Sequence, residues 1–207
     1  MKTISRTLRV LAATALATTV LLSQALASPI VSISPVTQTI GVGGFATIDI
    51  IVSGLTDPTG GFALTLSFNN TILSGESFAN DPGPPPKMGA SPLDLSGGFS
   101  GNTLDLFFVA DMTETEASLA ASEGGGFTLA TVTFKGLVDG LSPLTLSNVV
   151  LSTWDGGLNG GPATLAGVEA VNGSVCVGGN CVPEPGSMLL VATALGALAI
   201  RRRKQAA

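Results

Sequence analysis

The chain of 207 residues has no histidine, no tyrosine, one tryptophan and only two cysteines. The absence of histidine excludes the Ser-His-Asp and Cys-His catalytic mechanisms, together with every zinc site that has a histidine ligand. Two cysteines are too few for a four-thiolate metal site or an iron–sulfur cluster. The 9 lysine and arginine residues are outnumbered by 14 aspartate and glutamate residues, whereas a nucleic-acid partner requires clustered cations. We therefore expect no nucleic-acid partner.

The few charges are unevenly placed along the chain. Only Lys87 and Lys135 lie between residues 28 and 186, while all 14 acidic residues do. The same stretch contains every proline, every phenylalanine and Trp154. A segment of roughly 150 residues is long enough for one domain that buries about two-thirds of its unfolded surface. The middle of the chain is therefore predicted to be one anionic, loop-rich domain.

Residues 1–27 have the organisation of a signal peptide. Three cations open the segment, and residues 10–22 form an apolar run. Ala25 and Ala27 supply the small-x-small pattern that signal peptidase accepts, so we expect cleavage before Ser28. An uncleaved anchor helix, the alternative, needs a longer apolar core. The mature chain is then exported to a compartment that permits disulfides.

The C-terminal end has three parts in order. Pro183, Glu184 and Pro185 are followed by the apolar run 187–200 and then by four cations, Arg201, Arg202, Arg203 and Lys204. As a helix, this run spans about 21 Å, less than the ~30 Å hydrocarbon core, so it suits a temporary transmembrane stop. The cations are expected to stay in the cytoplasm, which leaves the domain outside. The prolines keep the chain extended and accessible just outside the membrane.

These three parts resemble a PEP-CTERM sorting signal. The resemblance implies processing near residues 183–185 by exosortase, a membrane transpeptidase-like enzyme of exopolysaccharide-producing Gram-negative bacteria. It also implies a transient stage in the inner membrane, followed by attachment to the cell surface or release there. A plain C-terminal anchor with incidental prolines is the alternative.

Between residues 29 and 177, apolar residues recur with the period of two that is typical of strands. Residues 62–68 show the clearest alternation, and residues 104–110 have apolar side chains on both faces. The same pattern predicts strands at 31–34, 46–52, 72–78, 127–135, 144–151 and 168–177. Only residues 113–122 have helical composition, with Thr113 as the candidate cap. Many short strands and no βαβ rhythm predict an all-β sandwich with one short helical segment.

Two segments of this region carry a second resemblance. Residues 60–73 (GGFALTLSFNNTIL), and residues 106–111 (LFFVAD) with the later 124–134 (GGGFTLATVTF), are similar to segments of the cohesin domain. The resemblance implies a nine-strand jelly-roll β-sandwich. This sequence departs from the family at Asn69-Asn70, where an aspartate is expected, and in the Pro-rich insert 79–96.

The two resemblances together divide the chain into four parts. A signal peptide at 1–27 precedes a cohesin-like sandwich at 28–177. A linker at 178–186, which contains the Pro-Glu-Pro motif, leads to a transmembrane segment and basic cytoplasmic tail at 187–207.

Two groups of residues are candidates for ligand contact. Asp111, Glu114 and Glu116 are candidate ligands for Ca²⁺, the only cofactor considered, although their spacing matches no EF-hand loop and a solvated acidic loop is favoured. Trp154, with Asp155 and Asn159 nearby on a Gly-rich loop, is a candidate for stacking on a sugar ring. The alternative for this tryptophan is to plug one end of the core.

Cys176 and Cys181 enclose two glycines that let the chain fold back. In an exported protein, two cysteines so placed are expected to form a disulfide.

The sequence favours a non-enzymatic cell-surface or extracellular-matrix protein. Nothing places two carboxylates across a cleft, as a glycosidase requires, and neither Lys87 nor Lys135 stands in a Ser-x-x-Lys pattern. The expected partners are exosortase, exopolysaccharide or other matrix proteins, and the membrane through residues 187–200 before processing. A carbohydrate-binding module and a cohesin that docks a dockerin-bearing partner are the alternatives, which fold alone does not separate.

Overall fold

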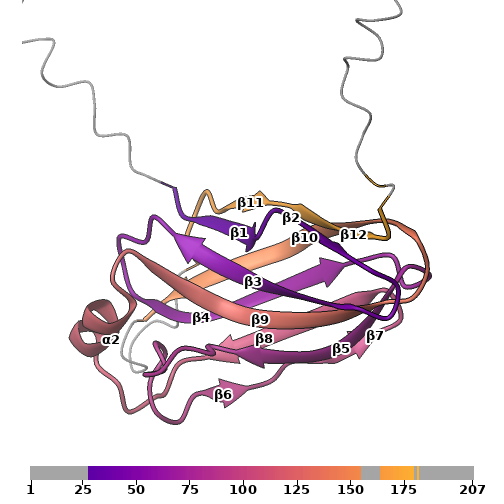
Figure 1. The fold of residues 1–207 in the computed structure, drawn as a ribbon. Coiled ribbons are helices and arrows are strands. Elements are labelled where there is room, and N and C mark those ends of the chain that lie inside the picture. The colour runs from indigo at the N-terminus through magenta and orange to yellow at the C-terminus, as the bar shows by residue number, and fades with distance from the viewer. Residues whose placement is uncertain (1–27, 155–163, 180, 182–207) are drawn as a thin grey trace, which may run out of the picture.

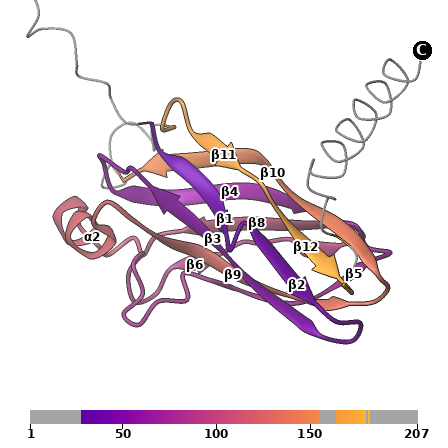
Figure 2. The same ribbon diagram turned by 45° about the horizontal axis from the view of Figure 1, so that its top comes forward.

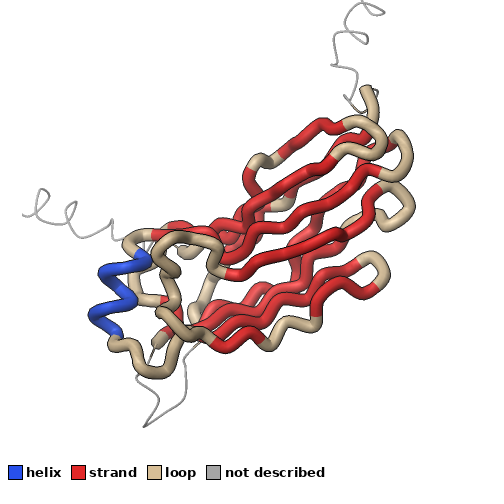
Figure 3. Tube along the Cα trace, turned by 60° about the horizontal axis from the view of Figure 1, so that its bottom comes forward, coloured by secondary structure: helices blue, strands red, loops and turns tan. Residues whose placement is uncertain are grey.

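The computed structural model describes residues 28–154, 164–179 and 181. In these ranges the chain forms two β-sheets that pack face to face, with one helix at an end of the sandwich (Figure 1, Figure 3). The predicted class, an all-β sandwich with one short helical segment, is confirmed. No helix in the described part of the chain is long and apolar enough to cross a membrane. The predicted signal peptide 1–27 and the predicted transmembrane run 187–200 lie outside the described residues.

One sheet has five strands in the order β11-β1-β3-β9-β5. These strands are β1 (Ile30–Ser34), β3 (Phe45–Ser53), β5 (Leu73–Asn80), β9 (Gly126–Gly136) and β11 (Glu169–Val171). The other sheet has seven strands in the order β2-β12-β10-β4-β8-β6, with β7 also paired to β8. Its strands are β2 (Thr37–Ile40), β4 (Thr59–Ser67), β6 (Leu93–Asp94), β7 (Gly98–Ser100), β8 (Thr103–Val109), β10 (Gly140–Thr153) and β12 (Gly173–Val177). The helix, α2, covers Glu116–Glu123.

The first two strands of the domain pair with its last two strands, one pair in each sheet. β1 pairs in parallel with β11, and β2 pairs in parallel with β12, while the other strand pairs of the described chain are antiparallel. Figure 2 shows the indigo strands β1 and β2 beside the yellow strands β11 and β12. The predicted strand 168–177 is therefore two strands, because the chain changes sheet at Asn172. The side-chain oxygen of Asn172 accepts a hydrogen bond from the Leu146 backbone N–H at 2.9 Å.

Inward-facing side chains of both sheets form one core. Phe62, Leu64 and Leu66 on β4 are at most 2% exposed and share a cluster with Ile48 and Ile50 on β3. Burying each such side chain contributes about 1.5–3 kcal/mol to stability. The alternation that predicted strand 62–68 is thus the alternation of buried and outward positions in β4.

Aromatic side chains fill one end of this core. The rings of Phe68 and Phe99 each lie 5.0–6.0 Å from that of Phe134, centroid to centroid, at steep angles. Gly75 on β5 lets the Phe99 ring pack directly against the backbone, because a β-carbon at position 75 would overlap the ring.

Several predicted bounds differ from the observed ones for local reasons. The structure adds the short strands β2, β6 and β7 to the eight that the alternating pattern predicted, and it divides the predicted strand 168–177 into β11 and β12. Twelve strands are therefore described, where the cohesin resemblance implied nine. The helix starts later than predicted: Thr115 is the N-cap, and its hydroxyl accepts a hydrogen bond from the Ser118 backbone N–H at 3.2 Å. The prediction of Thr113 as the cap is wrong, because its hydroxyl donates to Asp111 instead.

The last residue of α2, Glu123, holds the helix against β4. This carboxylate is only 3% exposed; Oε2 accepts a hydrogen bond from the Thr59 backbone N–H at 2.7 Å, and Oε1 has no partner among the described residues. Burial, together with the nearby charge of Asp81, raises the pKa of Glu123 from 4.5 to about 7 against the opposing effect of the Thr59 hydrogen bond. The helix is therefore attached through a group that titrates near neutral pH.

Stability should rise as the pH falls from 8 to 5. The folded chain takes up a proton at Glu123 below about pH 7, whereas the unfolded chain does so only near pH 4.5. The difference corresponds to about 3 kcal/mol, fully present below pH 4.5 and lost as the pH rises through 7. The free energy of unfolding in urea, measured at pH 8 and at pH 5, gives this difference. Glu123→Gln should abolish this dependence, and the exposed Glu116→Gln on the same helix should keep it; a pH-independent wild type would contradict the assignment.

Neighbouring phenylalanines on β8 should differ in their effect on stability. Phe108 is 5% exposed and its ring lies 5.8 Å from that of Phe62, whereas Phe107 is 45% exposed and points away from the core. Phe108→Ala should lower the free energy of unfolding by about 3–5 kcal/mol. Phe107→Ala should lower it by less than about 1 kcal/mol, as surface substitutions do. Equal losses in denaturant unfolding would show that both rings serve the core.

Candidate functional site

An apolar row crosses the outer face of the seven-stranded sheet. Phe107 on β8 lies opposite Ala63 on β4, which in turn lies opposite Val150 on β10. Phe107 is 45% exposed and Val150 is 42% exposed. Because the three residues are register partners, their side chains stand side by side on the surface turned away from the core.

The row continues toward β6. Leu93 is the register partner of Val109, and the Leu95 backbone N–H donates to the Phe107 carbonyl at 2.8 Å. Leu93 and Leu95 are about half exposed. We call Leu93, Leu95, Phe107, Ala63 and Val150 the outer apolar row.

A bulge in β10 brings Val150 into the row. The pairing with β4 advances by two residues on β4 but by three on β10 between Ser147 and Val150. Asn148 takes up the extra residue with φ of 52°. The bulge thus keeps both Ser147 and Val150 as register partners of outward-facing residues of β4.

A polar row lies beside the apolar one. Thr65 on β4 is flanked by Asp105 on β8 and Ser147 on β10. The Thr65 hydroxyl donates to Asp105 Oδ1 at 2.8 Å, which orients this exposed carboxylate along the sheet. The outer face therefore presents apolar side chains next to one negative charge.

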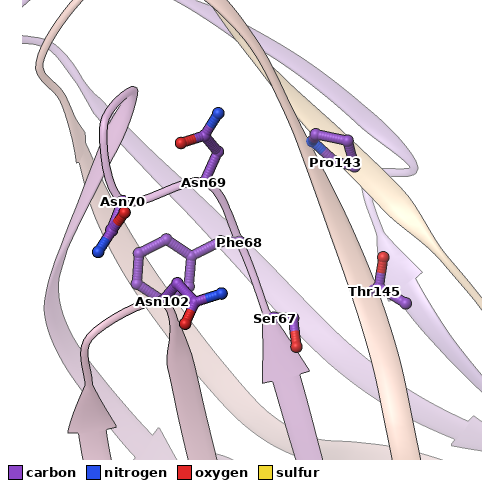
Figure 4. Close-up of a pocket in the computed structure, with 7 residues that line it drawn as sticks. All are labelled: Ser67, Phe68, Asn69, Asn70, Asn102, Pro143 and Thr145. Carbon is purple, nitrogen blue, oxygen red and sulfur yellow. The ribbon is translucent and has the colours of Figure 1, made fainter.

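A hollow of about 360 Å³ opens at the end of this face far from α2. Figure 4 shows the amides of Asn69, Asn70 and Asn102 near the Phe68 ring on one side, with side chains of β10 on the other. Its lining residues are Ser67, Phe68, Asn69, Asn70, Asn102, Pro143 and Thr145. Asn69 Oδ1 accepts hydrogen bonds from the Thr71 backbone N–H and hydroxyl. No hydrogen bond to another described residue engages the side-chain amides of Asn70 and Asn102.

The predicted sugar-contact residues are only partly described. Trp154 is half-buried and packs against the core, and its backbone N–H donates to the Pro58 carbonyl at 3.1 Å. Asp155 and Asn159 lie outside the described residues. Stacking of Trp154 on a sugar ring therefore stays a prediction.

Two of the three candidate Ca²⁺ ligands, Asp111 and Glu114, accept hydrogen bonds from nearby residues of the chain. Both carboxylate oxygens of Asp111 accept hydrogen bonds: Oδ1 from the Thr113 N–H and hydroxyl, and Oδ2 from the Ser91 N–H. The Thr113 hydrogen bonds, with the one from Ser91, hold the pKa of Asp111 below its usual range. Glu114 accepts from the Ser118 hydroxyl, and Glu116 is exposed on the first turn of α2. Among the described residues, no three such side chains are arranged to hold a metal ion.

Cys176 and Cys181 form the predicted disulfide, with their Cα atoms 5.5 Å apart. This bond attaches Cys181 to β12, only two residues before Pro183. Ser28, the expected first residue of the mature chain, is exposed. The other predicted signal residues lie outside the described ranges: Ala25, Ala27, Pro183, Glu184, Pro185, Arg201, Arg202, Arg203 and Lys204.

The sequence interpretation missed the outer apolar row and the asparagine-lined hollow. The apolar residues on both faces of 104–110 were the available signal for Phe107. The contribution of Val150 depends on the bulge in β10, and the hollow depends on loops that meet only in the fold.

Comparison with known proteins supports both resemblances. Residues 182–204 match the family model of the PEP-CTERM protein-sorting motif. The fold is similar to a non-cellulosomal cohesin from the hyperthermophilic archaeon Archaeoglobus fulgidus, at 18% identity and a TM-score of 0.54 over 74% of this chain and 93% of that chain. No curated protein matches the chain.

Two cohesins of Acetivibrio cellulolyticus are also similar. A type II cohesin domain from its cellulosome has 17% identity and a TM-score of 0.57 over 72% of this chain and 95% of that chain. The sixth cohesin of its scaffoldin B, solved in complex with a Cel5 dockerin mutant, has 14% identity and a TM-score of 0.54 over 73% of this chain and 99% of that chain. At such identities the likeness shows the fold alone. The chain therefore carries a PEP-CTERM sorting motif and a cohesin-like β-sandwich, which support an exported protein with a cohesin-like domain.

Proposed function

We propose that this chain is a non-enzymatic cell-surface or extracellular-matrix protein that binds another protein through the outer apolar row. The observation that carries the proposal is the line of exposed apolar side chains that runs across three neighbouring strands of one sheet face. Phe107→Ala is expected to leave the fold intact, so folding gives little reason to expose an aromatic ring there. Contiguous exposed apolar side chains with a polar rim are typical of protein interfaces.

The chemistry of the partner follows from the charges around the row. Asp105 on β8 is exposed beside the row, and Lys87 and Lys135 are the only cations between residues 28 and 186. A partner with an apolar centre and a lysine- or arginine-bearing rim would complement this face. The absence of histidine from the whole chain supports a binding role over a catalytic one.

A dockerin-bearing protein is one form that such a partner can take. The sixth cohesin of the A. cellulolyticus scaffoldin B was solved with a dockerin bound. The shared fold does not by itself carry that function to this chain. Matrix proteins with the same surface chemistry satisfy the same requirement.

The C-terminal tail would direct the domain to the cell surface or the matrix. In the proposed route the signal peptide 1–27 is removed and the run 187–200 holds the chain in the inner membrane. Exosortase then processes the chain near residues 183–185, and the sandwich 28–177 with its linker 178–186 reaches the cell surface or the exopolysaccharide matrix of a Gram-negative bacterium. The match of residues 182–204 to the sorting motif supports this route.

Glycan binding is a second candidate function, and the asparagine-lined hollow favours it. Amide side chains donate to and accept from sugar hydroxyls, and the side-chain amides of Asn70 and Asn102 have no hydrogen-bond partner within the described residues.

A binding assay tests the proposed function. Processed protein is immobilised, and the extracellular matrix fraction of the producing bacterium is passed over it. The captured partner is then purified, and its affinity for variants is measured. Phe107→Asp should weaken binding at least about tenfold, because it places a charge at the centre of the interface. Val36→Asp, at a residue 53% exposed outside the row, is the matched control and should bind like the wild type.

The same assay separates the alternatives. Loss of binding in both aspartate variants would indicate nonspecific charge repulsion and would contradict the proposed site. Retention of a polysaccharide by Phe107→Asp, with its loss in Asn70→Ala, would place recognition at the hollow and support the second candidate.

A further inference from the structure

Four exposed apolar side chains gather at the end of the sandwich opposite α2. They are Val42, Phe45, Leu137 and Val138, with exposures of 42–60%. Val42 lies in the β2–β3 turn, Phe45 begins β3, and Leu137 and Val138 lie in the β9–β10 turn. We call these four residues the apolar tip.

Backbone hydrogen bonds join the two turns of the tip. The Gly43 N–H donates to the Gly136 carbonyl at 2.8 Å, and the Gly136 N–H donates to the Gly44 carbonyl at 2.9 Å. The Leu137 N–H donates to the Ile72 carbonyl at 2.8 Å, which attaches the second turn to the start of β5. The tip is therefore a fixed surface rather than two separate loops.

The chain leaves the domain at this same end. Val177, the last residue of β12, is the register partner of Gly140, the first residue of β10. The Gly178 N–H donates to the Ile40 carbonyl at 2.8 Å, immediately before the β2–β3 turn. The disulfide then holds Cys181 at this point, with its Sγ 3.1 Å from the Gly140 carbonyl. Figure 1 shows the end of β12 and the β9–β10 turn on the side opposite α2.

The sequence between Cys181 and the apolar run is short. Residues 182–186 separate Cys181 from Ser187, a stretch that spans at most about 20 Å when fully extended. The 14 residues of β10, which run the length of the sandwich, extend about 46 Å. With residues 187–200 in a bilayer, the end of the domain that carries the tip must lie near the lipid.

Acidic residues are concentrated at the end of the sandwich that lies away from the apolar tip. The end that carries α2 holds six acidic residues and one cation, Lys87. The acidic residues are Asp57, Asp81, Asp111, Glu114, Glu116 and Glu123. Near the tip, the charged residues are Lys135, the register partner of Phe45, Asp139 in the β9–β10 turn, and Glu76 on the neighbouring strand β5. The tip is thus the end that an anionic membrane surface repels least.

We propose that the apolar tip lies against the lipid surface of the inner membrane until the tail is processed. The proposal rests on the membrane stage of the proposed function. The occupant is the boundary between headgroups and acyl chains, which accepts apolar side chains from a protein held at that depth. The tether selects lipid over a second copy of the chain, because it holds the tip close to the bilayer at all times.

This contact explains where the Pro-Glu-Pro motif would be presented. With the tip on the membrane, residues 183–185 lie between the disulfide and the bilayer surface, within reach of a membrane enzyme. The long axis of the sandwich then stands away from the membrane, and α2 with its acidic neighbours points outward.

Tryptophan fluorescence in lipid vesicles tests the proposal with the chain from residue 28 to residue 207, which retains the unprocessed tail. Trp154, the sole tryptophan, follows β10 at the α2 end and reports on the far end of the sandwich. The double variant Phe45→Trp, Trp154→Phe moves the reporter to the tip. Vesicles with bromine on the upper acyl chain should reduce the fluorescence of the double variant relative to unbrominated vesicles. They should leave the fluorescence of the wild type unchanged.

A second set of variants controls for incidental contact. Adding Val42→Asp and Val138→Asp to the double variant should remove the quenching, whereas adding Val150→Asp, on the outer face, should not. Circular dichroism confirms that each variant is folded.

Each outcome decides a separate claim. Flotation with the vesicles but no quenching at position 45 would overturn this proposal and leave the sorting route standing. Failure of the chain to float would overturn the membrane stage and this proposal with it. A dimer in detergent, with a tip tryptophan that bromine does not reach, would show that a second copy covers the tip.

Discussion

The position of β12 between β2 and β10 determines at which end of the sandwich the chain leaves the domain. Its pairing with β10 ends at Val177 and Gly140, so the chain emerges at the end of the sandwich without the helix. The Cys176–Cys181 disulfide extends that attachment to two residues before the sorting motif. The point where the chain leaves the domain, the apolar tip and the hollow therefore lie toward one end, and α2 with its acidic neighbours lies at the other.

The seven-stranded sheet has one face in the core and one exposed face. The period of two along β4 and β8 sends Phe62 and Phe108 into the core and leaves Ala63 and Phe107 outside. The core needs only one face, so the other is available for binding at little expense in stability.

The sequence predicted what depends on local pattern. Alternation located the strands with long apolar repeats, and the tail motif and both cysteines were recognisable from residue type and spacing alone. The sequence did not predict the features that depend on tertiary contacts. The change of sheet at Asn172 depends on a hydrogen bond to β10, and the cap at Thr115 depends on Asp111 occupying Thr113. The buried Glu123 was also not predicted, since its environment is made by β4, 64 residues away.

The central claim is that a folded binding domain is exported and then processed through its tail. Fractionation of cells that produce a variant with Pro183→Ala, Glu184→Ala and Pro185→Ala tests it most directly. The account predicts normal synthesis and export, with the domain trapped in the inner membrane and residues 201–204 still attached, because three alanines favour helix over the extended motif. If this variant reaches the surface or the medium at the wild-type rate and size, the tail is an ordinary anchor and the account is contradicted.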